Sequence, residues 1–162
     1  PNIEGKEPDF ILFSQNVGLI IFEVKDWMLD QIWEANPQYF RLQVGYDIES
    51  RKSPFQQARD YQYNLVDKIK ADGQLISRDA AHHGNVKIPF HHGVVFPNIN
   101  KLEWINNGFE RVTGTDKIFF WDDLHPSSDI CSDTSGKCFQ DALEKRYFKQ
   151  LGVQELSIKE NL

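Results

Sequence analysis

This sequence is poor in several features that define protein classes. Its 162 residues include only two cysteines, Cys131 and Cys138, which argues against a disulfide-rich secreted scaffold. We expect two free cytosolic thiols, with a disulfide or a metal pair as the alternatives. No apolar run approaches the roughly 20 residues of a membrane-spanning helix, and no secretory signal peptide is visible. These absences predict a cytoplasmic protein without membrane contact.

Positive charge is also scarce, because the formal net charge is −6. Such a balance argues against a general polyanion binder, although DNA binding needs only a local basic stripe. The densest group of basic residues lies between positions 51 and 70 and is either a solvated helix face or a contact for phosphate groups. It consists of Arg51, Lys52, Arg59, Lys68 and Lys70.

Two apolar segments near the start, residues 8–13 and 18–25, have the length of strands and are separated by a polar turn. They predict a β-hairpin. Asp9 opens the first segment, and Glu23 and Lys25 close the second, so all three charges lie at the hairpin end away from the turn. Because side chains alternate along a strand, Glu23 and Lys25 share a face.

The length of the turn decides where Asp9 lies. A three-residue loop closed by Ser14 and Gly18 would place Asp9 opposite Glu23. A register in which the turn moves by one residue would place Asp9 opposite Lys25. In both cases Asp9 shares the face of the other two charges, and only a two-residue loop would turn it away. We adopt the same-face arrangement as the working hypothesis.

Two carboxylates and an ammonium group at one strand end make a poor core. Like unit charges about 4 Å apart repel by roughly 4 kcal/mol at an effective dielectric constant of about 20. A Mg²⁺ ion would relieve this repulsion, since it binds one or two carboxylates and keeps several waters for a phosphate. The alternative is a salt-bridged hairpin end with ordinary solvated charges.

The rest of the chain predicts a mixed central sheet flanked by helices. Residues 39–48 alternate between apolar and polar side chains and predict one further strand. A helix should start at residues 53–56, with Ser53 as N-cap and Gln56 closing a capping box, and end near Ala71. The other expected elements are strands at 88–96 and 117–121, a short helix at 98–105 and a last helix at 137–151.

Histidine-based zinc binding is a third possibility, but the spacings match no ligand pattern. His91 and His92 are adjacent in an expected strand, so they should face opposite sides of the sheet. We expect satisfied or exposed histidines. The five are His82, His83, His91, His92 and His125.

A series of short motifs occurs in a specific order. They are Pro8-Asp9-Phe10, Glu23-Val24-Lys25-Asp26-Trp27, Pro54-Phe55-Gln56-Gln57-Ala58 with Tyr61, Val94-Val95-Phe96-Pro97 and Trp121-Asp122-Asp123-Leu124. Together they resemble the nuclease-related domain, NERD, of the PD-(D/E)xK nuclease superfamily, in the form found N-terminal to superfamily I DNA helicases. The resemblance is clear over roughly the first two-thirds of the chain. It implies an α/β, restriction-endonuclease-like fold, whose usual first helix this sequence starts too late to contain.

The resemblance also implies residue roles. Asp9 and Glu23 would bind Mg²⁺ or Mn²⁺ together with the backbone carbonyl of Val24. Lys25 would position or activate the attacking water and stabilise charge on the phosphate. Gln57 would orient that lysine or the substrate, a role for which Gln56 is the competing residue.

We therefore expect a metal-dependent nuclease that hydrolyses DNA phosphodiester bonds, in one polypeptide with a DNA-repair helicase. Tyr61, Arg51, Lys52 and Arg59 would contact the substrate. The alternative is a non-catalytic module that binds DNA or positions a helicase with the same fold. Residues 1–151 would form the nuclease-related domain, and residues 152–162 a tail or linker.

Overall fold

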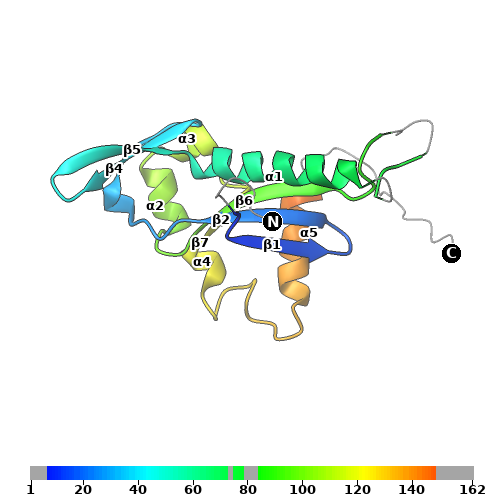
Figure 1. The fold of residues 1–162 in the computed structure, drawn as a ribbon. Coiled ribbons are helices and arrows are strands. Elements are labelled where there is room, and N and C mark those ends of the chain that lie inside the picture. The colour runs from blue at the N-terminus through cyan, green and yellow to red at the C-terminus, as the bar shows by residue number, and fades with distance from the viewer. Residues whose placement is uncertain (1–6, 73–74, 79–83, 149–162) are drawn as a thin grey trace.

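The computed structural model describes residues 7–72, 75–78 and 84–148, which form a mixed α/β fold with two sheets (Figure 1). The strands are β1 (Phe10–Ser14), β2 (Gly18–Val24), β3 (Ile32–Ala35), β4 (Tyr39–Val44), β5 (Asp47–Lys52), β6 (Phe90–Phe96) and β7 (Ile118–Phe120). The helices are η1 (Leu29–Gln31), α1 (Pro54–Ala71), α2 (Lys101–Asn106), α3 (Glu110–Thr113), α4 (Trp121–Leu124) and α5 (Lys137–Phe148).

The larger sheet is mixed, with strand order β1-β2-β6-β7. Strand β1 is antiparallel to β2, whereas β2, β6 and β7 are parallel. Ser14 pairs with Gly18, so the first of the two registers considered for the hairpin is the one observed. Extending this register by one residue puts Asp9 opposite Glu23. The predicted hairpin and its three-residue loop are confirmed.

Helices cover both faces of this sheet. Helix α1 packs along β2 and β6 on one face, and α5 lies on the other (Figure 1). His91 and His92 reflect this division, because the His91 ring lies 5.0 Å from the ring of Tyr147 in α5, and His92 contacts Gln62 in α1. The two histidines face opposite sides, as predicted.

The prediction of one strand over residues 39–48 is wrong. The chain turns back at Gly45, which has φ of +62°, and Val44 pairs with Asp47 across a two-residue loop. The apolar alternation continues through this turn, but only its first half faces a core. Phe40 is fully buried, whereas Tyr46 is fully exposed at the tip of the hairpin. The β4–β5 hairpin extends away from the larger sheet and forms a second, antiparallel sheet with β3 (Figure 1).

The long helix begins and ends where the sequence predicts, but its N-terminus is not held by a capping box. The side chain of Ser53 makes no capping hydrogen bond. Its hydroxyl is buried and has no partner among the residues that the structure describes. Instead, the backbone N–H of Ser53 donates to the carbonyl of Gln38 at 3.0 Å, which ties the start of α1 to the turn before β4. The prediction missed β3, η1 and α3.

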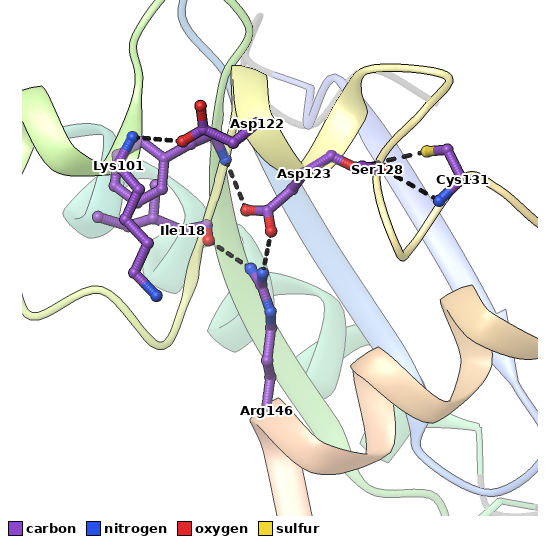
Figure 2. Close-up of polar contacts among 8 residues, drawn as sticks. Lys101, Ile118, Asp122, Asp123, Ser128, Cys131 and Arg146 are labelled. Carbon is purple, nitrogen blue, oxygen red and sulfur yellow. Dashed lines mark hydrogen bonds and ion pairs between the residues drawn. The ribbon is translucent and has the colours of Figure 1, made fainter.

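The last helix is fastened to the end of β7 through one arginine. Figure 2 shows the guanidinium of Arg146 donating to Asp123 Oδ1 and to the carbonyl of Ile118. Asp123 Oδ2 in turn accepts the backbone N–H of Phe120 at 3.0 Å. The guanidinium also lies 4.0 Å from the centroid of the Phe119 ring. These contacts join α4, β7 and α5 into one unit.

Some expectations lie outside the described residues. These are the segment before Glu7, His82 and His83, the end of the last helix at 149–151, and the tail at 152–162. Among the helices that the structure describes, none has both the length and the apolar character needed to cross a membrane.

Candidate functional site at the end of strand β2

Glu23 is a charged residue in a buried position. It lies near the C-terminal end of β2, and only 4% of its surface is exposed. Its Oε1 accepts a hydrogen bond from Lys25 Nζ at 2.6 Å. Its Oε2 has no hydrogen-bond partner among the described residues. A buried carboxylate oxygen without a hydrogen-bond partner has lost its hydration and gained no interaction in exchange. This oxygen is therefore a candidate ligand for a cation.

Asp9 lies just before β1 and reaches the same strand end. Its Oδ2 accepts the backbone N–H of Val24 at 2.8 Å. In an extended strand the N–H and C=O groups of one residue point to the same side, so the carbonyl of Val24 faces the Asp9 edge. The structure therefore brings together Asp9, Glu23 and Val24, the three residues that the resemblance implies as metal ligands.

Tyr61 of α1 shows that both carboxylates lie near the helix. Burial is the main cause that raises the pKa of the Tyr61 hydroxyl, and the negative charges of Glu23 and Asp9 raise it further. A hydrogen bond with Gln57 acts in the opposite direction. Gln57 and Tyr61 are four residues apart and so are neighbours on one side of the helix. The two carboxylates and this side of α1 thus form a common polar cluster.

Lys25 connects this cluster to a groove of about 370 Å³, which we call the Lys25 groove. The ammonium lies 5.7 Å from the centroid of the Trp27 ring. The ammonium therefore lies within interaction distance of both the Trp27 ring and the Glu23 carboxylate. The groove is lined by Lys25, Trp27, Gln31, Leu42, Gln43, Val44, Arg51, Lys52 and Gln57.

The predicted substrate-binding cations do not form one patch. Arg51 and Lys52 line the Lys25 groove, but each has a carboxylate partner. Arg51 pairs with Glu49, and Lys52 pairs with Asp60 at 2.5 Å. Arg59 does not line this groove and borders a different pocket, described below. The basic group is thus divided and partly neutralised.

Two residues of the groove wall, Gln31 and Gln43, are not predicted by the sequence. They line the groove because η1 and the β4–β5 hairpin stand beside the end of β2. Nothing in the local sequence distinguishes these two glutamines from surface residues. Trp27, the last residue of the Glu23–Trp27 motif, packs against Phe40 and Phe96. Its position directly after the Glu23–Lys25 pair was the available signal.

The residues at this site fit a divalent metal only as a two-carboxylate site. No group of three or more His, Cys, Asp or Glu side chains in the described part of the chain is placed to hold a metal ion. Mg²⁺, however, commonly binds through one or two carboxylates and completes its shell with waters and a substrate phosphate. The partnerless Oε2 of Glu23 is the observation that supports this fit.

Fold and site together define a class. A mixed α/β domain with two carboxylates and a lysine gathered at one strand end is compatible with a nuclease-like fold. The family model of the nuclease-related domain, NERD, matches residues 2–97, which is more than half of the chain, so the protein belongs to this family. This membership suggests a nuclease-related function. No curated protein and no solved structure matches the chain.

Proposed function

We propose that this protein is a metal-dependent nuclease that hydrolyses phosphodiester bonds at the end of β2. The observation that supports this most directly is the environment of Glu23. One of its oxygens binds Lys25 Nζ and the other is buried without a partner among the described residues. In a buried ion pair with only a structural role, further hydrogen bonds normally satisfy the second oxygen of the carboxylate.

In this proposal Asp9, Glu23 and the carbonyl of Val24 hold Mg²⁺ or Mn²⁺. The ion would lower the pKa of bound water and polarise a phosphoryl oxygen. The backbone N–H of Val24 donates to the Asp9 carboxylate and so holds this ligand, which lies just before β1, against the end of β2. Burial of Glu23 excludes water from one side of the site and strengthens the local electrostatic interactions.

Lys25 stabilises the negative charge that develops on the phosphate and positions the attacking water. Its side chain is only 19% exposed, and Glu23 and Trp27 fix its orientation. A preorganised charge of this kind requires little rearrangement during the reaction. Gln57 contributes from α1, where its hydrogen bond with Tyr61 and its place in the Lys25 groove suit it to orient the lysine or the substrate.

DNA is the proposed substrate, and a helicase in the same polypeptide is the proposed partner. Both rest on the resemblance of the Glu23–Trp27, Val94–Pro97 and Trp121–Leu124 segments to helicase-linked domains of this family. The Lys25 groove supports a nucleic-acid substrate, because Lys25, Arg51 and Lys52 lie along it. The pairing of Arg51 and Lys52 with carboxylates implies that a bound phosphate would have to compete with Glu49 and Asp60.

The proposal is tested by cleavage of a labelled DNA in the presence of Mg²⁺ or Mn²⁺. We expect Glu23→Gln and Lys25→Gln each to reduce cleavage by at least about a hundredfold, the scale for loss of a preorganised charge at the reacting group. Asp67→Asn, an exposed acidic residue of α1, is the matched control and should cleave like the wild type. Full cleavage by both site variants would contradict the proposed roles. DNA binding without cleavage by the wild type would favour the non-catalytic docking module.

A further inference from the structure

A second pocket lies on the other side of α1 from Gln57 and Tyr61. Arg59 is two residues from Gln57, which places it about 200° around the helix. This pocket has a volume of about 200 Å³, and we call it the Arg59 pocket. Its walls come from α1, β6, α3 and the segment before β7. It is lined by Pro37, Phe55, Gln56, Arg59, His92, Val112, Thr113 and Lys117.

The charges around the Arg59 pocket are of one sign. Arg59 and Lys117 both line it, and the ion pairs of the described residues include neither of them. Their positive charges also act on His92. Burial is the main cause that lowers the pKa of His92, and the charges of Lys117, Arg59 and His91 lower it further, to about 4. In a chain of net charge −6, two cations converge here without a carboxylate partner among the described residues. Such an arrangement lacks a counter-anion.

Hydrogen bonds fix the state of His92. Gln62 donates from Nε2 to the carbonyl of Phe90 at 3.2 Å, so its Oε1 faces His92 Nδ1 at 2.5 Å. Nδ1 must therefore carry the proton and donate it to Gln62. The neutral ring then has its lone pair on Nε2. An anion beside this ring would favour its protonation.

We infer that the Arg59 pocket binds a phosphate group, with Arg59 and Lys117 as its charge partners. Gln56 lies one helical turn before Arg59 and adds a neutral donor to the same wall. His92 can add a second donor from Nε2 once the anion is present. The group could belong to free phosphate or a nucleotide, or to the backbone of a nucleic acid. The inference does not depend on the proposed nuclease activity, because none of these four residues belongs to the metal cluster.

The test uses the whole chain without divalent metal and inorganic phosphate as the probe. NMR of the His92 ring is followed against pH with phosphate or with chloride at equal ionic strength. We expect phosphate, but not chloride, to raise the pKa of His92 saturably. Arg59→Gln and Lys117→Gln should each weaken phosphate affinity about tenfold, as expected for loss of a charge-assisted hydrogen bond.

Control variants separate a charge effect from a folding effect. Lys117→Arg should retain phosphate affinity. Lys68→Gln should also retain it, since Lys68 is an exposed residue of α1 about 13 Å further along the helix than Arg59. An absence of any phosphate response beyond that of chloride, or equal affinity in Arg59→Gln, Lys117→Gln and the wild type, would overturn the inference.

Competition distinguishes the sources of the phosphate group. A short oligonucleotide that displaces inorganic phosphate, and loses affinity in the same two variants, identifies the backbone of a nucleic acid. Displacement by a mononucleotide alone identifies a free ligand. Either result supports a phosphate pocket. Loss of nuclease activity in Glu23→Gln with an unchanged His92 response would show that the two sites are independent.

Discussion

At the scale of single residues, Glu23 and His92 illustrate two ways to bury an ionisable group. Glu23 keeps a cation, Lys25, on one oxygen and leaves the other without a partner among the described residues. His92 lies among cations and is held neutral by burial and by their charge. The two side chains lie beside opposite flanks of α1, one facing the proposed metal and the other the proposed phosphate pocket.

The state of His92 predicts how stability depends on pH. Its pKa is about 4 in the fold and about 6.5 in the unfolded chain. The unfolded chain therefore binds more protons between these values, and the free energy of unfolding should fall as the pH drops from about 6.5 to about 4. The expected loss over this range is about 3 kcal/mol, since one unit of pKa shift corresponds to about 1.4 kcal/mol.

Urea unfolding across this pH range measures the effect. His92→Asn, which keeps a donor near the position of Nδ1, should make this slope smaller. Part of the slope should remain, because burial also lowers the pKa of His91. Asp133 does not interfere, since its hydrogen bonds with Ser135 lower its pKa to about 2 and its contribution is lost only below about pH 4. An equal slope in His92→Asn and the wild type would contradict the account.

At the residue scale, the sequence predicted that Asp9, Glu23 and Lys25 lie together at one end of the first hairpin, and the observed register agrees with this placement. Strand alternation alone places Glu23 and Lys25 on one face. A loop with an odd number of residues, here three, places Asp9 on the same face. The division of the basic residues could not be predicted. Helical periodicity separates Arg59 from Gln57, but the partners of Arg51 and Lys52 depend on how β5 packs beside α1.

At the scale of elements, local signals decided which segments were predicted correctly. Helix α1 has a proline at its first position and an apolar stripe, so both of its ends could be predicted. The β4–β5 hairpin was missed because apolar alternation continues from Val44 through Tyr46 to Ile48. The positive φ of Gly45 is what turns the chain, and a single glycine within an alternating run was too weak a signal.

Strand β6 packs so closely against α5 at Gly93 that no side chain fits there. A Cβ atom there would lie 2.5 Å from the hydroxyl oxygen of Tyr147 and 2.8 Å from a ring carbon of Phe22. Gly93→Ala should therefore destabilise the fold by about 1–3 kcal/mol, the cost of overpacking a core. Thermal unfolding provides the measurement.

The source of this cost can be separated with a second substitution. Tyr147→Phe removes the hydroxyl. The hydrogen bond that this hydroxyl donates to the carbonyl of His92 is long, at 3.4 Å, so the single change should cost little stability. In the double variant, part of the stability lost in Gly93→Ala should return. Strict additivity of the two changes would argue against the contact.

At the scale of the whole molecule, the family match and the fold have different extents. The match ends at residue 97, but β7 supplies the fourth strand of the larger sheet and α5 covers one of its faces. The sequence predicted both elements from their apolar pattern. The separation into two sheets, with the groove between the smaller sheet and α1, depends on long-range packing and was not predicted.

The central claim is that the carboxylates at the end of β2 bind a divalent cation, and the most direct test is a calorimetric titration of the whole chain with Mn²⁺ in the absence of nucleic acid. We expect one saturable site in the wild type and in Asp67→Asn. Glu23→Gln should bind Mn²⁺ at least about tenfold more weakly, because one charged ligand is lost. Absence of Mn²⁺ binding by the wild type, or equal affinity in Glu23→Gln, would contradict the claim.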